Sequence, residues 1–195
     1  MVTERRIRLR QKKLSDARED YAWQTDPELC RLDAAEVLKM SYQQYLAEYT
    51  FELCYPTTGR YEFAIENLQG EHIGNCVYYN VDTYEGKAEL GIMIGNRAYW
   101  NQGYGKEAVD ALLDHIFQKT RLEKVYLTTL EWNLRAQKCF KKCGFTPCGK
   151  ISRDGSVFLM MVIYRSEWEK LRGKNNQQDN SETSFEQNPP EVSKA

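Results

Sequence analysis

The most constraining feature of this 195-residue sequence is a glycine turn, Gln102-Gly103-Tyr104-Gly105-Lys106, at which the hydrophobic period changes. Upstream of the turn, short β-branched and aromatic runs alternate with turn residues, as expected for strands. Downstream, apolar residues recur at helical spacing and define one buried stripe: Ala108, Val109, Leu112, Leu113, Ile116 and Phe117. A helix N-terminus presents unpaired N–H groups, and glycine lets a ligand approach them closely. The turn therefore predicts either an anion site, most simply for a pyrophosphate, or a tight connection without a ligand.

The remaining sequence patterns complete a mixed domain. Strands are expected at 7–11, 61–66, 72–80, 88–94, 124–130, 145–151 and 157–164, and helices at 15–24, 42–53, 103–120 and 134–143. The secondary structure of residues 27–38 stays ambiguous. Ser15 or Asp16 is expected to cap the first helix, and Gly144 to end the last one. This order predicts an α+β (mixed α/β) fold with a central, mostly antiparallel twisted sheet of about seven strands, about four helices and one βαβ crossover.

Composition separates a domain from a tail. Residues 1–173 are predicted to form one domain. Residues 174–195 are rich in polar residues and carry one aromatic, so we expect them to be disordered. A net charge of -1 argues against a nucleic-acid partner. The sequence shows no signal-peptide pattern and no apolar run of membrane-spanning length, which predicts a cytoplasmic protein without a membrane partner.

The six cysteines form no CxxC pair. Cys139 and Cys143 are four residues apart and would share one face of a helix. We interpret them as reduced thiols in or beside the core and expect no metal site. Thiols without a secretory signal also indicate a reducing compartment.

Two familiar glycine patterns fit the turn poorly. A Walker P-loop would need glycine where Trp100 stands and Ser or Thr where Glu107 follows Lys106. The Rossmann pattern GxGxxA matches from Gly103 to Ala108, but residues 95–102 separate the turn from the preceding strand, and antiparallel strands come first. An NAD(P)-dependent oxidoreductase is kept as a lesser alternative.

Two motifs together resemble those of the GCN5-related N-acetyltransferase (GNAT) superfamily. Ala88-Glu89-Leu90-Gly91-Ile92-Met93-Ile94, followed by Tyr99-Trp100-Asn101-Gln102-Gly103-Tyr104-Gly105-Lys106-Glu107-Ala108, is similar to motif A. Asn133-x-x-Ala136-x-x-x-Phe140-x-x-x-Gly144-Phe145 is similar to motif B. The resemblance covers about Arg6 to Leu171 and is nearest to the ribosomal-protein-alanine and spermidine acetyltransferase branch. It implies an acetyl-CoA-dependent N-acetyltransferase in which a primary amine attacks the thioester directly.

The resemblance also assigns residues to the cosubstrate, acetyl-CoA. The pantetheine arm is expected to bind the backbone of Ile92, Met93 and Ile94 as an extra strand. The pyrophosphate is expected at Trp100, Asn101, Gln102, Gly103, Tyr104, Gly105 and Lys106. Trp100 replaces the Gln or Arg usual in the family, so the backbone N–H groups and Lys106 carry more of the binding. Asn133 and Phe140 are assigned to the cofactor arm, and Asn133 also suits a helix N-cap.

The chemistry requires a base, because an aliphatic amine is mostly protonated at neutral pH. Glu89 lies on the motif A strand where the family often places a carboxylate, and we predict that it is this base. The alternative is a structural Glu paired with a nearby Lys or Arg. The family's proton donor to the leaving thiolate is a tyrosine at the position of Phe140, so the usual acid is missing here.

The acceptor is expected between residues 23–55 and the turn from Arg153 to Phe158. The first region is rich in aromatic and acidic residues, which suit a cationic amine, although tyrosines at helical spacing more often indicate packing. Polyamines, amino acids, amino sugars, aminoglycosides and protein N-termini all remain candidates. A catalytically weak acyl-CoA-binding sensor is a further alternative, motivated by Phe140, and a homodimer through the C-terminal hairpin stays open.

Overall fold

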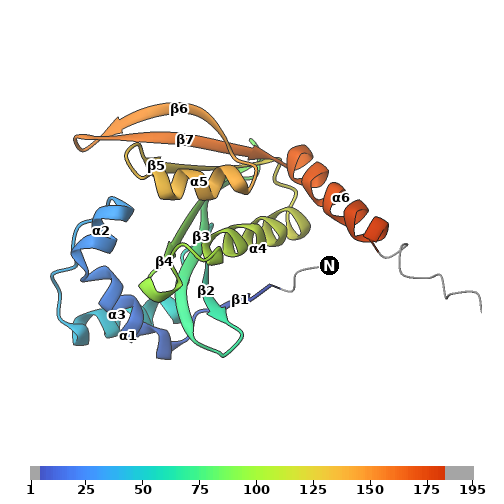
Figure 1. Cartoon of the computed structure of the whole chain (residues 1–195). Helices are drawn as coiled ribbons and strands as arrows, with labels where there is room; N and C mark the ends of the chain where they lie inside the picture. The colour runs from blue at the N-terminus through green and yellow to red at the C-terminus, as the bar shows by residue number, and fades with distance from the viewer. Residues whose placement is uncertain (1–4, 183–195) are drawn as a thin grey trace, which may run out of the picture.

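A computed structural model describes residues 5–182 and shows a twisted seven-stranded sheet with helices on both faces (Figure 1). The strand order is β1-β2-β3-β4-β5-β7-β6, and every neighbouring pair is antiparallel except β4 and β5. The strands are β1 (Ile7–Gln11), β2 (Tyr61–Asn67), β3 (His72–Asp82), β4 (Lys87–Ile94), β5 (Lys124–Leu130), β6 (Thr146–Arg153) and β7 (Ser156–Tyr164). The predicted mixed fold with one βαβ crossover is confirmed.

Six α-helices are present in the described residues, where about four were expected. They are α1 (Ala17–Gln24), α2 (Pro27–Asp33), α3 (Tyr42–Cys54), α4 (Tyr104–Lys119), α5 (Leu134–Lys142) and α6 (Arg165–Glu182). Two short 3₁₀ turns, η1 (Leu14–Asp16) and η2 (Arg97–Tyr99), precede α1 and α4.

Helix α4 covers one face of the sheet and provides the centre of the core. Its apolar stripe packs against alternate residues of the strands, among them Ile65, Cys76, Leu90 and Val125. The opposite face is covered by α1 and α3, which share a smaller cluster built on Ala17, Tyr45 and Tyr49. Because side chains alternate along a strand, Glu89 and Met93 point away from α4. The two sheet faces thus provide a dry core on one side and a polar face on the other.

Helix α2 settles the ambiguous segment. Asp26 caps it by accepting hydrogen bonds from the N–H groups of Glu28 and Leu29, at 2.9 and 3.1 Å, and Pro27 occupies the first turn. The cap expected for the first helix was wrong in detail. That helix follows a 3₁₀ turn, and the Asp16 carboxylate binds Arg10 and the N–H of Lys13 and leaves the start of α1 uncapped.

The C-terminal region differs from the prediction. Helix α6 was not expected, and its backbone continues to Glu182, into the segment predicted to be disordered from residue 174. Its first turns are held by tertiary contacts. The ring centres of Trp168 and Phe117 are 5.3 Å apart, and the Trp168 indole N–H donates to Asp114 at 2.8 Å. Residues 183–195, the rest of the predicted tail, lie outside the described residues.

Candidate active site

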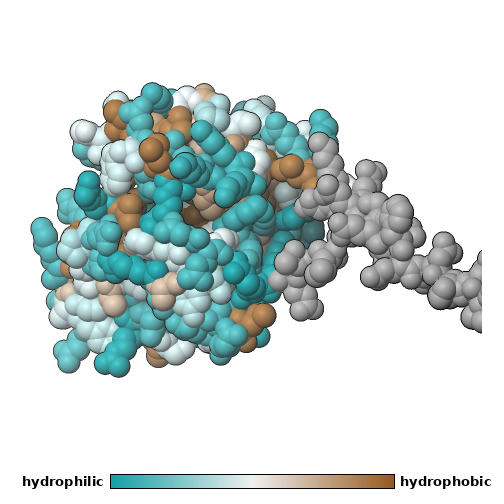
Figure 2. Space-filling view, in the orientation of Figure 1, coloured by the Kyte–Doolittle hydropathy of each residue, from teal (hydrophilic) through white to brown (hydrophobic). Residues whose placement is uncertain are grey.

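Strands β4 and β5 pair over only three residues and then separate. The parallel ladder joins Lys87–Glu89 to Lys124–Tyr126. Beyond it, β4 runs to Ile94 paired only with β3, and β5 runs to Leu130 paired only with β7. The facing edges of the two strands therefore present backbone groups that can bind an extended amide chain. Figure 2 shows the surface hollowed between the part that contains β5 to β7 and the part below it.

The glycine turn forms the N-terminus of α4. Gly103 is the N-cap with φ of +92°, a conformation that favours glycine. The first backbone bond of the helix runs from the N–H of Glu107 to the carbonyl of Gly103, at 3.1 Å. The N–H groups of Tyr104, Gly105 and Lys106 consequently have no acceptor within the helix. These groups and the helix dipole make the turn a suitable anion site.

Side chains around the turn mostly bind other parts of the protein. Lys106 donates to Asp110 at 2.6 Å, and Arg6 binds Glu107 and the carbonyl of Gln102. A Cβ at Gly105 would make only ordinary van der Waals contacts, with the Cys139 Sγ at 3.6 Å and with Ile94 at 3.8 Å. The turn thus offers mainly backbone N–H groups, and a phosphate role for Lys106 stays a prediction that requires Lys106 to leave Asp110.

Trp100 anchors the start of the turn. Its indole N–H donates to the carbonyl of Ile94 at 2.6 Å. The guanidinium of Arg135, in the first turn of α5, lies 3.8 Å from the centre of the Trp100 ring, and that of Arg97 lies 5.5 Å away. Arg135 is not among the site residues predicted from the sequence. Its position two residues after the motif B Asn was the only signal available.

The two motif B residues have packing roles that the structure describes. Asn133 is buried, and its side chain accepts from the N–H of Ala136 at 3.2 Å, as an N-cap does. Phe140 is buried edge-to-face against Phe145, with ring centres 5.9 Å apart. Contact of either residue with a cofactor stays a prediction.

Glu89 occupies the last paired position before β4 and β5 separate. Its carboxylate accepts from the side-chain amide of Asn80 at 3.0 Å and from the Thr128 hydroxyl at 3.4 Å. Among residues 5–173, whose side chains the structure describes, no Lys or Arg forms an ion pair with Glu89, so the purely structural alternative lacks its partner there. Two tyrosines flank it: burial, followed by the negative charge of Glu89, raises the pKa of Tyr79 to about 12 and also raises that of Tyr126.

The two regions expected to bind the acceptor lie together. A cavity of about 450 Å³ between α2 and the β6–β7 turn is lined by residues of both, including Arg31, Trp132, Arg153 and Phe158. Asp33, at the end of α2, keeps an exposed side chain, yet desolvation by the protein packed around its carboxyl group raises its pKa to about 6. On α3, desolvation and then the charge of Glu62 raise the pKa of Glu52.

Several residues of the expected acceptor region have other roles. Tyr45 and Tyr49 are buried in the smaller cluster, so these two tyrosines pack against other residues, as their helical spacing also indicated. Trp23 packs against His72 and Gly95, and Glu28 is paired with Arg97. No helix within residues 5–182 is long and apolar enough to cross a membrane, and no group of three potential metal ligands occurs there.

Comparison with known proteins identifies relatives of this chain. The family model "Acetyltransferase (GNAT) domain" matches residues 6–146. A probable spermine N(1)-acetyltransferase of Bacillus subtilis subsp. natto is 25% identical over 100 residues, 49% of this chain and 66% of that protein. An aminoglycoside N(6')-acetyltransferase of Klebsiella pneumoniae is 26% identical over 118 residues, 55% of this chain and 59% of that protein. The matched part of the chain thus spans less than two thirds of the length of each of these relatives.

Solved structures share the fold. The spermidine N-acetyltransferase of Vibrio cholerae in complex with CoA and spermine superposes with a TM-score of 0.74 at 20% identity, over 84% of this chain and 98% of that one. An aminoglycoside acetyltransferase in complex with ribostamycin and coenzyme A gives a TM-score of 0.73 at 21% identity, over 86% and 98%.

Proposed function

Because the chain belongs to the GCN5-related N-acetyltransferase family, whose structures include complexes with CoA and acetyl-CoA, we propose that it transfers the acetyl group of acetyl-CoA to a primary amine. The observation that supports this most is the separation of β4 from β5 beside the free N–H groups that begin α4. One groove then offers a strand edge for an amide chain and an anion site for a pyrophosphate. A Rossmann dinucleotide site lacks its parallel sheet, since β4 and β5 are the only parallel pair within residues 5–182.

The proposed donor site follows from this groove. The pantetheine amides bind the free backbone edge near Ile92, Met93 and Ile94, and the pyrophosphate binds the N–H groups of Tyr104, Gly105 and Lys106. Arg135 is added to the predicted residues, because its guanidinium lies beside Trp100 and supplies positive charge that the Trp does not.

In the proposed reaction the neutral amine attacks the thioester carbonyl, the C–N bond forms, and the C–S bond breaks as the thiolate leaves. Glu89 takes the proton that the amine loses, directly or through water. A backbone N–H of β4 near Met93 or Ile94 binds the oxyanion. Asn80 and Thr128 orient the Glu89 carboxylate. The raised pKa values of Tyr79 and Tyr126 move these phenols further from ionisation, so both are protonated at neutral pH and neither is the base.

We propose a polyamine or an amino sugar as the acceptor. Glu62, which is paired with Arg60, and Glu89 lie on the polar sheet face, Glu52 lies on α3, and Asp33 lies beside the cavity under the β6–β7 turn. Several carboxylates suit a substrate with more than one ammonium group. The matched relatives are named for spermine and for aminoglycosides, which agrees with this class. The proposed cytoplasmic location rests on the six free cysteines, and a homodimer remains a prediction.

A thiol-release assay tests the proposal with acetyl-CoA and a panel of spermidine, spermine, kanamycin, alanine and a short peptide. We expect turnover with the polycations, and a loss of about 10²- to 10⁴-fold in kcat/KM for Glu89→Gln. Glu85→Gln, an exposed carboxylate on the β3–β4 turn, is the matched control. Binding of coenzyme A without turnover of any amine, and no effect of Glu89→Gln, would support the sensor alternative.

A further inference from the structure

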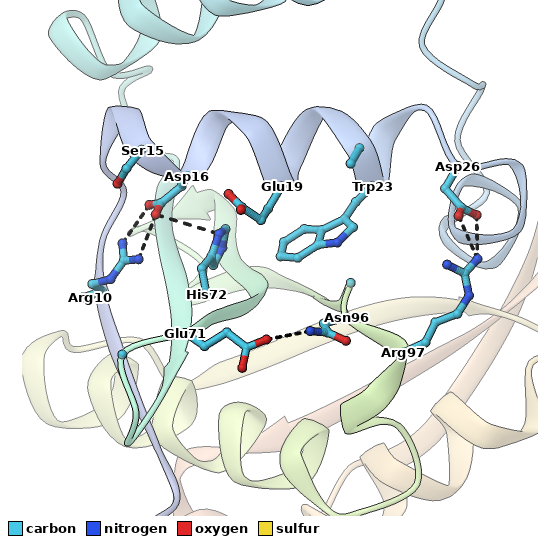
Figure 3. A pocket seen from close by; sticks show the side chains of 13 residues that line it. Arg10, Ser15, Asp16, Glu19, Trp23, Asp26, Glu71, His72, Asn96 and Arg97 are labelled. Atoms are coloured by element: carbon cyan, nitrogen blue, oxygen red, sulfur yellow. Dashed lines mark hydrogen bonds and ion pairs between the residues drawn. The ribbon is translucent and has the colours of Figure 1, made fainter.

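The cavity beside α1 and the thiol groups of the chain lie in different places. The cavity, of about 750 Å³, is formed by α1, by the turn between β2 and β3, and by the segment that follows β4 (Figure 3). Its arginines are already paired, Arg10 with Asp16 and Arg97 with Asp26, and no cysteine of the described chain lines it. Two cysteines on α5 lie instead beside the glycine turn, where the acetyl donor is proposed to bind.

Cys139 lies on α5 with its thiol against the start of α4. A Cβ at Gly105 would be 3.6 Å from the Cys139 Sγ and 3.8 Å from the Ile94 side chain. The sulfur therefore lies beside the backbone that presents the free N–H groups of Gly105 and Lys106, and close to the end of β4. The side chain is partly exposed, so a small reagent can reach the sulfur.

A second thiol supports the first from the next turn of the helix. Cys143 is the C-cap of α5 and is buried, and its position four residues after Cys139 places it on the same face. Its Sγ lies 3.8 Å from the Lys106 carbonyl oxygen, and the two thiols hydrogen-bond to each other. When Cys139 is ionised, the Cys143 S–H can donate to the Cys139 sulfur. The pair thus lies along the first turn of α4.

The surroundings of Cys139 favour its thiolate form. The hydrogen bond with Cys143, and then the charges of Lys106 and Lys142, lower the pKa of Cys139 against the opposing effects of burial and of Asp110. The free N–H groups and the dipole at the start of α4 act in the same direction. Since the thiolate is the nucleophilic form of cysteine, Cys139 has the position and the charge environment of a reactive thiol.

We propose that Cys139 is a site of covalent thiol modification and that its modified form and bound acetyl-CoA exclude each other. With an alkyl halide, the S–C bond forms as the carbon–halogen bond breaks and the halide leaves. With hydrogen peroxide, the S–O bond forms as the O–O bond breaks and hydroxide leaves, so the sulfur is oxidised to a sulfenic acid and the peroxide is reduced.

Either product adds atoms beside Gly105, where the pyrophosphate is proposed to approach the N–H groups of α4. Modification therefore blocks the donor, and a bound donor covers the thiol. This competition rests on the proposed donor site, whereas the reactivity of Cys139 does not.

The six cysteines of the chain provide internal controls for a direct test. The reduced full chain is treated with limiting iodoacetamide at pH 7, and peptide mass spectrometry measures the rate at each cysteine. We expect Cys139 to react at least about threefold faster than the exposed Cys54 and Cys148, because a larger fraction of it is thiolate. Cys30 and Cys76 should stay unmodified, because both are buried and burial raises the pKa of each.

Acetyl-CoA has no free thiol and can therefore be present during the alkylation. At saturation it should slow the reaction of Cys139 at least about tenfold and leave the rates of Cys54 and Cys148 unchanged.

Variants separate the reactive thiol from its neighbours. Cys143→Ala should slow the alkylation of Cys139 severalfold, because it removes the hydrogen bond that stabilises the thiolate. After treatment with hydrogen peroxide, dimedone should trap a sulfenic acid at Cys139, and the affinity of the wild type for acetyl-CoA should fall at least about tenfold. Cys139→Ser should keep its affinity after the same treatment. Cys148→Ser is the matched control and should behave like the wild type.

The inference is wrong if Cys139 reacts no faster than Cys54 and Cys148, or if peroxide lowers the affinity of Cys139→Ser as it does that of the wild type. The thermal shift of the unmodified protein with acetyl-CoA distinguishes this failure from failure of the proposed function. A shift without protection of Cys139 overturns the competition and leaves the proposed function intact. The absence of a shift overturns the proposed function and the competition with it, and the rates at the three cysteines then decide the reactivity of Cys139.

Discussion

The guanidinium of Arg135 lies 3.8 Å from the centre of the Trp100 indole and so joins the first turn of α5 to the residue that begins the glycine turn. The same indole is bonded to the end of β4 through the Ile94 carbonyl. A side chain that would be an unusual phosphate ligand thus holds three parts of the groove together and positions a cation beside them.

Arg135→Ala is expected to raise the KM for acetyl-CoA about five- to tenfold with little change in kcat, because it removes a cation that contributes to binding and not to the chemical step. Arg135→Lys should recover part of this loss, since lysine keeps the charge but not the planar stacking. Arg121→Ala, at an exposed arginine on the loop after α4, is the control. Equal KM values for Arg135→Ala and the wild type would remove Arg135 from the donor site.

Two glycine substitutions should have opposite effects on stability. At Gly95 a Cβ would lie 2.1 Å from the Trp23 ring, so Gly95→Ala must displace a buried indole and should destabilise the fold by about 1–3 kcal/mol. At Gly105 a Cβ meets only ordinary contacts within a helix, so Gly105→Ala should be neutral or stabilising by up to about 1 kcal/mol. Urea unfolding monitored by circular dichroism measures both.

Asp33 is expected to make stability depend on pH. Its pKa in the folded protein is raised to about 6, above the ordinary 3.8, so the folded state holds more protons between these values, and stability falls as pH rises through this window. Asp33→Asn should therefore be more stable than the wild type at pH 7.5, by about 1 kcal/mol or less because the carboxyl group is accessible to solvent. The gain should be absent at pH 3.5. Melting temperatures at both pH values provide the measurement. An equal gain at both would show that the raised pKa of Asp33 is not the cause of the gain.

Arg165 closes the C-terminal end of α4. Its guanidinium donates to the carbonyls of Phe117 at 2.6 Å, Thr120 at 2.9 Å and Leu122 at 2.7 Å. Arg165→Ala would leave partly buried acceptors unpaired and should cost about 2–4 kcal/mol. Lys170→Ala, at an exposed cation on α6, should change stability by less than about 0.5 kcal/mol. A melting temperature for Arg165→Ala equal to that of the lysine variant would show that solvent replaces these bonds.

Local patterns of the sequence determined most of the secondary structure and led to the proposed donor site. The change from strand to helix period at Gly103, the stripe on α4 and the strands around it depend on residues close in the chain, and the structure confirms them. The family motifs are equally local, and the domain match over residues 6–146 agrees with them. A helix start signal, Asp26 followed by Pro27, stands at the beginning of the segment 27–38. The composition of the segment made this signal difficult to recognise.

Only the tertiary structure decided the features that join distant parts of the chain. The separation of β4 from β5 depends on pairing across the sheet, and no residue in either strand predicts where the hydrogen-bonded ladder ends. Asn80 and Thr128 meet at Glu89 from two strands, and Arg135 reaches Trp100 from another helix. Helix α6 is too polar to be predicted from its own pattern, and its contacts with α4 through Trp168 give it a place in the fold. These contacts arise because packing energy depends on which surfaces meet in space, which sequence spacing does not specify.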